Sequence, residues 1–340
     1  ATVTNATSDF TLKNLTLDGS GSESGASFEI VARGTNGTTG YSYNIEQLTV
    51  SGTGTLANTN PSGAPGYQSQ WNIGNLTNAE EGTSGVLNLN SWTNTVNRSI
   101  INLNGGDFAG EINLLGKSNT GTRRAALNVN AETAAADAVV SLSSSGQKVA
   151  LGIGAERVVL KGINGSEGSI ISGAQAYHKD STAYNGDDFN AIDTTFRTLV
   201  IDTDGTDDTA AVNSSTSATL GSYLNLEKQG AGTQTFSGDM SGFNGTIEVT
   251  GGTLKFTSGF TTSSATISQG AELKLSDTAT VTNGTMSQVK LNSTGISSVD
   301  TTGATKGSIS NANVAIAQLA EEASFTIQDM TLTNTTITAA

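Results

Sequence analysis

The stretch INLNGG at Ile101–Gly106 shows the pattern that decides the fold. Apolar residues take every second position, asparagines fill the positions between them, and a glycine pair ends the run. The same alternation returns at Leu15–Asp18, Leu87–Asn90, Leu127–Asn130, Leu224–Glu227, Ile247–Thr250 and Leu273–Leu275. Alternation with a period of two predicts a β-strand with one buried and one solvent-facing side. The strands are expected to be short, because Gly, Asn or Asp interrupts each run.

The repetition along the whole chain favours a solenoid. We predict an all-β fold, a right-handed parallel β-helix that forms a single elongated domain over residues 1–340. At about 20–25 residues per turn, the chain would make roughly 12–15 turns. Proline cannot donate to a strand ladder, and the only two prolines, Pro61 and Pro65, share one loop. A β-sandwich of the kind found in adhesin modules is the alternative.

The composition excludes several classes of function. The 340 residues carry a net charge of −14, contain no Cys, and include His178 as the one histidine. Zinc–thiolate sites, cysteine nucleophiles and sites with two histidines are therefore excluded. Nucleic-acid binding is not expected from so acidic a chain. We predict that the protein is not an enzyme and that it has no catalytic residue, no metal and no cofactor.

One segment resembles a known family. Residues Leu226–Phe256 read LEKQGAGTQTFSGDMSGFNGTIEVTGGTLKF, with a Lys-x-Gly-x-Gly start, a Phe-Ser-Gly middle and a Gly-Gly-Thr-Leu end. This pattern resembles the passenger-associated repeat of bacterial autotransporters. The match is carried by Lys228, Gly230, Gly232, Phe236, Gly238, Gly245, Ile247, Val249, Gly251, Gly252, Thr253 and Leu254. The rest of the chain is similar in style to such passenger domains.

The resemblance implies a location and a class of function. It implies export through the outer membrane and display on the bacterial cell surface, with a translocator barrel outside this chain as a partner. The Gly-Asp-Ser-Gly motif of the protease subgroup does not occur here. The resemblance then points to adhesins of the antigen-43 type, which promote aggregation and biofilm formation. The expected partners are a copy of the protein on a neighbouring cell, or a host matrix protein or glycosaminoglycan.

The asparagines of the alternating runs are the first candidate binding residues. They are Asn88, Asn90, Asn102, Asn104, Asn128 and Asn130, and Asn113 has the same context. Because they alternate with Leu or Ile, we expect them to point into solvent and to form a polar ridge. Amides donate and accept hydrogen bonds, each worth about 0.5–1.5 kcal/mol, so adhesion would depend on many copies. The alternative is that they are ordinary corner and surface residues of a solenoid.

A second candidate is the region 173–197, which interrupts the strand rhythm and is expected to project from the rod. It contains aromatic and acidic residues, of which Tyr184, Asp187 and Asp188 are predicted to bind ligand. The alternative is an insertion that packs over apolar surface of the rod.

An acidic run follows this region. The segment Asp202–Asp208 begins like a calcium loop, but its twelfth position is Asn213 instead of Glu. A solvated Asp-rich turn is the plainer interpretation. The alternative function is a polysaccharide-processing β-helix enzyme, a lyase or hydrolase, that uses an Asp cluster with Arg197. The cluster consists of Asp187, Asp188, Asp202, Asp204, Asp207 and Asp208.

Basic residues are few and scattered. The pair Arg123–Arg124 lies near Lys117, Lys148, Arg157 and Lys161 in sequence. A local basic patch there could meet a sulfated glycosaminoglycan. The alternative is that these residues are solvated strand ends.

Overall fold

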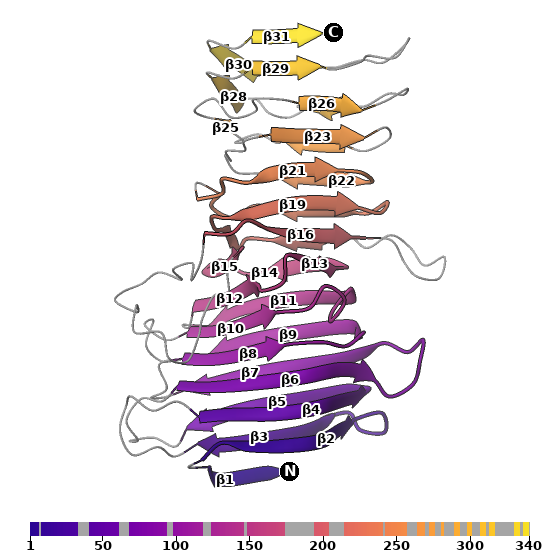
Figure 1. Cartoon of the computed structure of the whole chain (residues 1–340), viewed down its shortest axis with the longest axis vertical. Helices are drawn as coiled ribbons and strands as arrows, with labels where there is room; N and C mark the ends of the chain where they lie inside the picture. The colour runs from indigo at the N-terminus through magenta and orange to yellow at the C-terminus, as the bar shows by residue number, and fades with distance from the viewer. Residues whose placement is uncertain are drawn as a thin grey trace.

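The computed structural model is a stack of short strands with the N-terminus at one end and the C-terminus at the other (Figure 1). It describes residues 1–6, 8–32, 41–60, 68–93, 98–117, 124–145, 148–173, 194–203, 214–240, 242–256, 264–268, 272–275, 280–281, 289–292, 298–300, 307–310, 313–316, 330–333 and 336–339. Every strand pairing in this part of the chain is parallel. Strands that follow one another along the chain lie in different sheets, so the backbone coils around an axis.

Three sheets, here named A, B and C, form the walls of the coil. Sheet A consists of β1 (Thr2–Ala6), β3 (Ala26–Ala32), β5 (Thr53–Asn60), β7 (Gly85–Thr93), β9 (Ala109–Lys117), β11 (Asp137–Ser145), β14 (Gly162–Gly165), β17 (Ser214–Thr216), β20 (Thr233–Phe236), β22 (Thr253–Phe256), β24 (Glu272–Leu275) and β27 (Ser298–Asp300). Sheet B consists of β2 (Phe10–Asp18), β4 (Tyr41–Ser51), β6 (Gln68–Asn78), β8 (Arg98–Leu103), β10 (Arg124–Val129), β12 (Lys148–Ile153), β15 (Ser169–Ser172) and β18 (Thr219–Leu220). Sheet C consists of β13 (Arg157–Leu160), β16 (Arg197–Asp202), β19 (Leu224–Gln229), β21 (Thr246–Val249), β23 (Ser264–Ser268) and β26 (Val289–Asn292).

Two smaller sheets lie toward the C-terminal end. One consists of β25 (Thr280–Val281), β28 (Gly307–Ser310) and β30 (Met330–Thr333), and the other of β29 (Asn313–Ile316) and β31 (Thr336–Ala339). Sheet A contributes twelve strands up to Asp300, and the strands β28 to β31 of the smaller sheets follow it, so the number of turns falls within the expected range.

Turn length varies more than the sequence pattern predicts. The register partners Phe236 and Phe256 are 20 residues apart, which fits the expected repeat. Ile112 and Val140 are 28 residues apart. The extra residues lie in the connections between strands, since the inward-facing rows stay in register.

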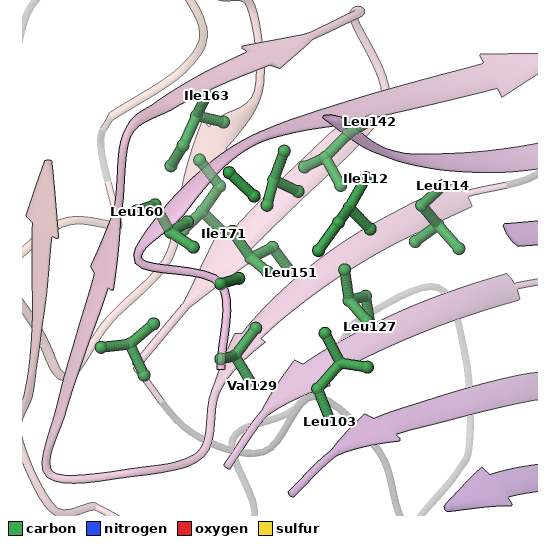
Figure 2. Packing of buried hydrophobic residues seen from close by; sticks show 14 of the residues in the cluster. Leu103, Ile112, Leu114, Leu127, Val129, Leu142, Leu151, Leu160, Ile163 and Ile171 are labelled. Atoms are coloured by element: carbon green, nitrogen blue, oxygen red, sulfur yellow. The ribbon is translucent and has the colours of Figure 1, made fainter. Parts of the chain in front are cut away.

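The core is a continuous row of aliphatic side chains inside the coil. Leu127 in β10 pairs with Ile101 in β8 and with Leu151 in β12, and all three are buried. Figure 2 shows Leu127 among the side chains of Leu103 and Ile112, which come from sheets B and A. Each such side chain contributes about 1.5–3 kcal/mol through burial. Near the N-terminal end the row becomes aromatic.

That aromatic row runs through three turns. The ring centroids of Phe10 and Tyr43 are 4.9 Å apart, and those of Tyr43 and Trp71 are 5.4 Å apart. Burial raises the pKa of Tyr43. The stack extends the aliphatic core to the first turns of the rod.

Two buried polar side chains hold positions in the core row. Gln234 is fully buried between Ser214 and Leu254 in the column of sheet A. Its Oε1 accepts from the Ile163 N–H (3.0 Å) and the Ser214 hydroxyl (2.6 Å), and its Nε2 donates to the Ile163 carbonyl (3.1 Å). Strands β14 and β17 share one register pair, Gly165 with Thr216. The Gln234 amide therefore bonds backbone groups that a longer strand pairing would have satisfied.

The second buried polar side chain is Lys228, which has no exposed surface. Its Nζ donates to the Thr203 hydroxyl (2.8 Å) and to the carbonyls of Gly230 (2.9 Å), Gly251 (3.3 Å) and Gln229. Gly230 has a φ of 70°, a backbone conformation that favours glycine. The lysine thus ties together the corners of two successive turns within residues 226–256.

The structure confirms the predicted parallel β-helix. The β-sandwich alternative is wrong, because a sandwich requires antiparallel sheets, whereas these strands pair only in parallel across the described ranges. The extent of the single domain over 1–340 stays a prediction. Within the part of the chain that the structure describes, no helix has the length and apolar character that crossing a membrane requires.

Candidate functional site

The outer face of sheet A carries an unbroken line of uncharged polar residues, which we call the sheet A ridge. Its members are Ser27, Thr55, Asn88, Asn113, Ser141, Asn164, Ser215 and Thr235. They come from eight successive strands of the sheet, β3 to β20. Because neighbouring strands lie about 4.8 Å apart, the ridge presents one polar group per turn over roughly 34 Å.

The ridge is accessible to a partner. Ser27, Asn164 and Ser215 are exposed, and the other members are half-buried. The Asn113 Nδ2 donates to the Asn88 Oδ1 (3.1 Å), and the Ser215 N–H donates to the Asn164 Oδ1 (3.3 Å). Each amide also has further donor or acceptor capacity. The structure therefore places Asn88 where the alternation predicts it.

Asn90 lies in the next column of sheet A, in register with Ala57 and Leu115. It is half-buried, and its Oδ1 is buried without a hydrogen bond within the described ranges. Leu115 beside it is 36% exposed, which makes it one of few large apolar side chains at the surface. The column beside the ridge is thus mixed in character, because Glu29 and Ser143 continue it at its two ends.

The prediction that Asn102 and Asn128 point into solvent is wrong. Their exposed fractions are 9% and 0%. They belong to a ladder on the outer face of sheet B that runs through Thr11, Asn44, Asn72, Asn102 and Asn128. The ladder passes from exposed Thr11 through half-buried Asn44 and Asn72 to buried Asn102 and Asn128. Each amide from Asn72 onward donates its Nδ2 to the Oδ1 of the asparagine one turn earlier, at 2.8 Å.

The physical reason for this correction is that the outer face of sheet B is not open to solvent here. Ile100, Ala126 and Ala150, two residues before the ladder positions, are also fully buried on this face. Alternation tells which face of a strand a residue occupies, but it does not tell whether that face is covered. The ladder satisfies polar groups that would otherwise be costly to bury.

Asn104 and Asn130 lie at a corner, directly after β8 and β10. The Asn130 Nδ2 donates to the Asn104 Oδ1 (2.9 Å), and Asn104 is exposed while Asn130 is half-buried. At the next turn the position is Gly154, where an added Cβ would lie 1.8 Å from the Asn130 Oδ1. These two residues form a corner motif that is separate from the sheet A ridge.

The other predicted site residues lie outside the described ranges. These are Tyr184, Asp187 and Asp188 of the region 173–197, and Asp204, Asp207 and Asp208 of the acidic run. Asp202 is the last residue of β16 and is half-buried. Among the described side chains, no group of three or more acidic or histidine residues is placed to hold a metal ion.

Sequence reasoning missed an ion cluster that spans sheet C. The Arg157 guanidinium contacts both carboxylate oxygens of Glu227, and its Nε lies 3.2 Å from the Glu132 Oε1. The hydrogen bond from Arg157 lowers the pKa of Glu227, and the same contact raises the pKa of Arg157. Arg157 and Glu227 are 70 residues apart, so nothing in the local sequence indicates the pair.

One groove in the described part of the chain is also polar. It has a volume of about 570 Å³ and is lined by Thr77, Asn78, Glu80, Glu81, Gly82, Thr83, Ser84, Asp107, Ala109, Asp137 and Lys161. The Lys161 Nζ lies 3.7 Å from the Asp137 Oδ1. The Asn78 amide, which could otherwise face a ligand, is bonded to the backbone of Ala109 at 2.8 and 3.0 Å. Four carboxylates and one lysine line this groove.

Comparisons of the chain with protein-family models, with curated proteins and with solved structures each found no match. The autotransporter resemblance of residues 226–256 therefore stays a prediction from the sequence.

Proposed function

We propose that this protein is a bacterial cell-surface adhesin that promotes aggregation and biofilm formation, and that attaches to host matrix or glycans, through the sheet A ridge. The observation that carries the proposal is the absence of charge from eight successive positions of the ridge in a chain of net charge −14. Two acidic rods repel one another at distances below the Debye length of about 8 Å. The uncharged ridge is the part of this face where such rods can touch at the lowest electrostatic cost, and Glu29 and Glu111 lie beside it on the same face.

The chemistry of the ridge supports binding without catalysis. Amides and hydroxyls both donate and accept hydrogen bonds, so a ridge can pair with an identical ridge or with the hydroxyl groups of a glycan. Each bond is worth about 0.5–1.5 kcal/mol, and the spacing of one turn lets many form in parallel. Many molecules on one cell would then convert weak contacts into firm adhesion.

The test is to display the chain on a bacterium that does not aggregate. Settling of the cells is measured beside their binding to an array of matrix proteins and glycans. Settling without array signal identifies self-recognition, and array signal without settling identifies host attachment. Release of reducing or unsaturated sugars from glycans by the purified chain would instead support the enzyme alternative.

Matched variants locate the binding face. Asn164→Lys combined with Ser215→Lys adds two positive charges to exposed positions of the ridge. Thr246→Lys combined with Glu248→Gln makes the same net change at exposed positions on the outer face of sheet C. We expect the ridge variant to lose settling or array binding and the sheet C variant to keep it. Equal behaviour of the two variants at equal surface expression would refute the assignment of the ridge.

A further inference from the structure

The turns of the coil are joined unequally at one boundary, which we call the junction. The junction separates β13, β14 and β15 from the next turn, which contains β16, β17 and β18. Across it, sheet A has one register pair, Gly165 with Thr216, and sheet B has two, which end in the short strand β18. Every earlier pairing in these two sheets has four or more register pairs. The strand ladder therefore joins the two turns chiefly in sheet C, where β13 and β16 share four register pairs.

In sheet A, side chains take the place of main-chain bonds at the junction. The register of β14 and β17 would continue for two further pairs of described residues, but the ladder stops at Gly165. The Gln234 amide bonds the N–H and the carbonyl of Ile163 (3.0 and 3.1 Å) and accepts from the Ser214 hydroxyl (2.6 Å). The Asn164 Oδ1 accepts from the Ser215 N–H (3.3 Å). Because Gln234 belongs to β20, its amide connects β14 with β20 past the short β17 between them.

A second side-chain contact crosses the same turn on sheet C. Arg157 of β13 donates to both carboxylate oxygens of Glu227 of β19, and β16 lies between these two strands (Figure 1). Val200 of β16, which is in register with Val159 and Glu227 on the outer face, is fully buried. The Arg157–Glu227 and Gln234–Ile163 contacts join residues 70 and 71 positions apart. Both contacts connect the turn before β16 with the turn after it.

The turn between these contacts is also reached by long connections. Residues 173–196 separate β15 from β16, and residues 203–213 separate β16 from β17. A connection of this length can span many relative positions of the strands that it joins, so ladder bonds and side chains must fix their positions. Each turn of a solenoid is held by its interfaces with its nearest neighbours, and a turn with a weak interface opens more readily than the others.

We propose that the junction is a hinge of the rod. Sheet C is the continuous side of the hinge, and the Gln234 amide holds the sheet A side closed. Opening on that side separates Asn164 from Ser215, which are neighbours on the sheet A ridge. The ridge then consists of two straight parts that can tilt relative to one another. The inference does not depend on what the ridge binds.

Spin labels on the purified chain test the hinge by pulsed electron paramagnetic resonance, since the chain has no native Cys. The first label pair, Ser143→Cys with Lys255→Cys, lies on the outer face of sheet A on opposite sides of the junction. The second label pair, Ser27→Cys with Ser143→Cys, lies on one side of it. Each pair is separated by four strand spacings, or about 19 Å along the axis. We expect the distance distribution of the first pair to be at least about twofold broader than that of the second.

Two variants separate the hinge from a general loss of stability. Gln234→Leu removes the amide that closes sheet A, whereas Asn102→Ala removes two ladder bonds away from the junction. We expect Gln234→Leu to broaden the distance distribution across the junction alone, and Asn102→Ala to leave that distribution as in the parent chain.

Three results would overturn the inference. Equal widths for the two label pairs in the parent chain would do so whether or not a variant folds. Broadening of both label pairs by Gln234→Leu would show that the amide supports the rod in general and closes no hinge. The same broadening across the junction in Asn102→Ala would show that any lost polar contact has this effect.

Discussion

Replacing Asn102 by Ala tests whether the sheet B asparagines hold the fold or bind a partner. Asn102 donates to the Asn72 Oδ1 and accepts from the Asn128 Nδ2, both at 2.8 Å, and its side chain is 9% exposed. The change removes two ladder hydrogen bonds of about 1 kcal/mol each. It also takes a partner from the buried Asn128 amide and from the half-buried Asn72 amide, which raises the total to about 2–4 kcal/mol.

Asn113→Ala is the matched control. Asn113 also lies between two neighbouring turns, but it is half-buried and makes one ladder bond, to Asn88 at 3.1 Å. Water can replace that bond, so we expect a loss of about 0.5 kcal/mol or less.

Hydrogen exchange of the amides in β8 and β10 is the suitable assay. A solenoid can open locally, so a single free energy of unfolding does not describe it. A cost of about 2–4 kcal/mol corresponds to exchange that is faster by roughly 30- to 700-fold at these amides. Exchange rates that are the same in Asn102→Ala and Asn113→Ala would refute the structural role of the ladder. Loss of adhesion in Asn102→Ala with unchanged exchange would restore its role as a binding residue.

Three further predictions concern the polar groups that the core and sheet C hold. Gln234→Leu leaves the backbone N–H and C=O of Ile163 without their side-chain partner. Hydrogen exchange in β14 should therefore become faster by an amount equivalent to about 2–5 kcal/mol. An exchange rate like that of the parent chain would contradict the assigned bonds. Lys228→Met removes the donor to the carbonyls of Gln229, Gly230 and Gly251, so it should lower the urea midpoint of the C-terminal half. An unchanged midpoint would show that packing alone holds the corners of these two turns. Because Arg157 lowers the pKa of Glu227, this pair stabilises the fold above the ordinary glutamate pKa of 4.5 and loses that contribution as pH falls through the lowered value. Urea midpoints between pH 6 and 3 should therefore fall less in Glu227→Gln than in the parent chain, and parallel curves would contradict the pairing.

The sequence was sufficient to predict the fold, because the inward rows repeat at short range. Leu127 and Val129 lie on either side of Asn128 in a six-residue strand, and this alternation indicates which face points into the coil. The glycine pairs Gly105–Gly106 and Gly251–Gly252, which follow two of these runs, mark where the coil turns. The parallel pairing followed from the open-ended repetition of like segments.

The candidate site was predictable only in part, because register between turns is a long-range property. Asn88 and Asn128 have the same local context, Leu-Asn-Leu or Leu-Asn-Val, yet the first is half-buried on the ridge and the second is fully buried in the ladder. The difference depends on whether the outer face is covered, which the strand itself does not encode. The sequence did hold a signal that Gln234 is buried. Gln234 occupies the same alternating set of positions in β20 as Phe236, and that set faces the core.

Cysteine labelling at the ridge tests the central claim most directly, since the chain contains no native Cys. Ser215→Cys and Thr246→Cys each place one thiol at an exposed outer position, on the ridge and on sheet C. Maleimide labelling of both is followed while displayed cells aggregate or while a ligand found on the array is added. The account predicts that labelling slows at position 215 and stays unchanged at position 246. Protection at position 246 with free labelling at position 215 would contradict it.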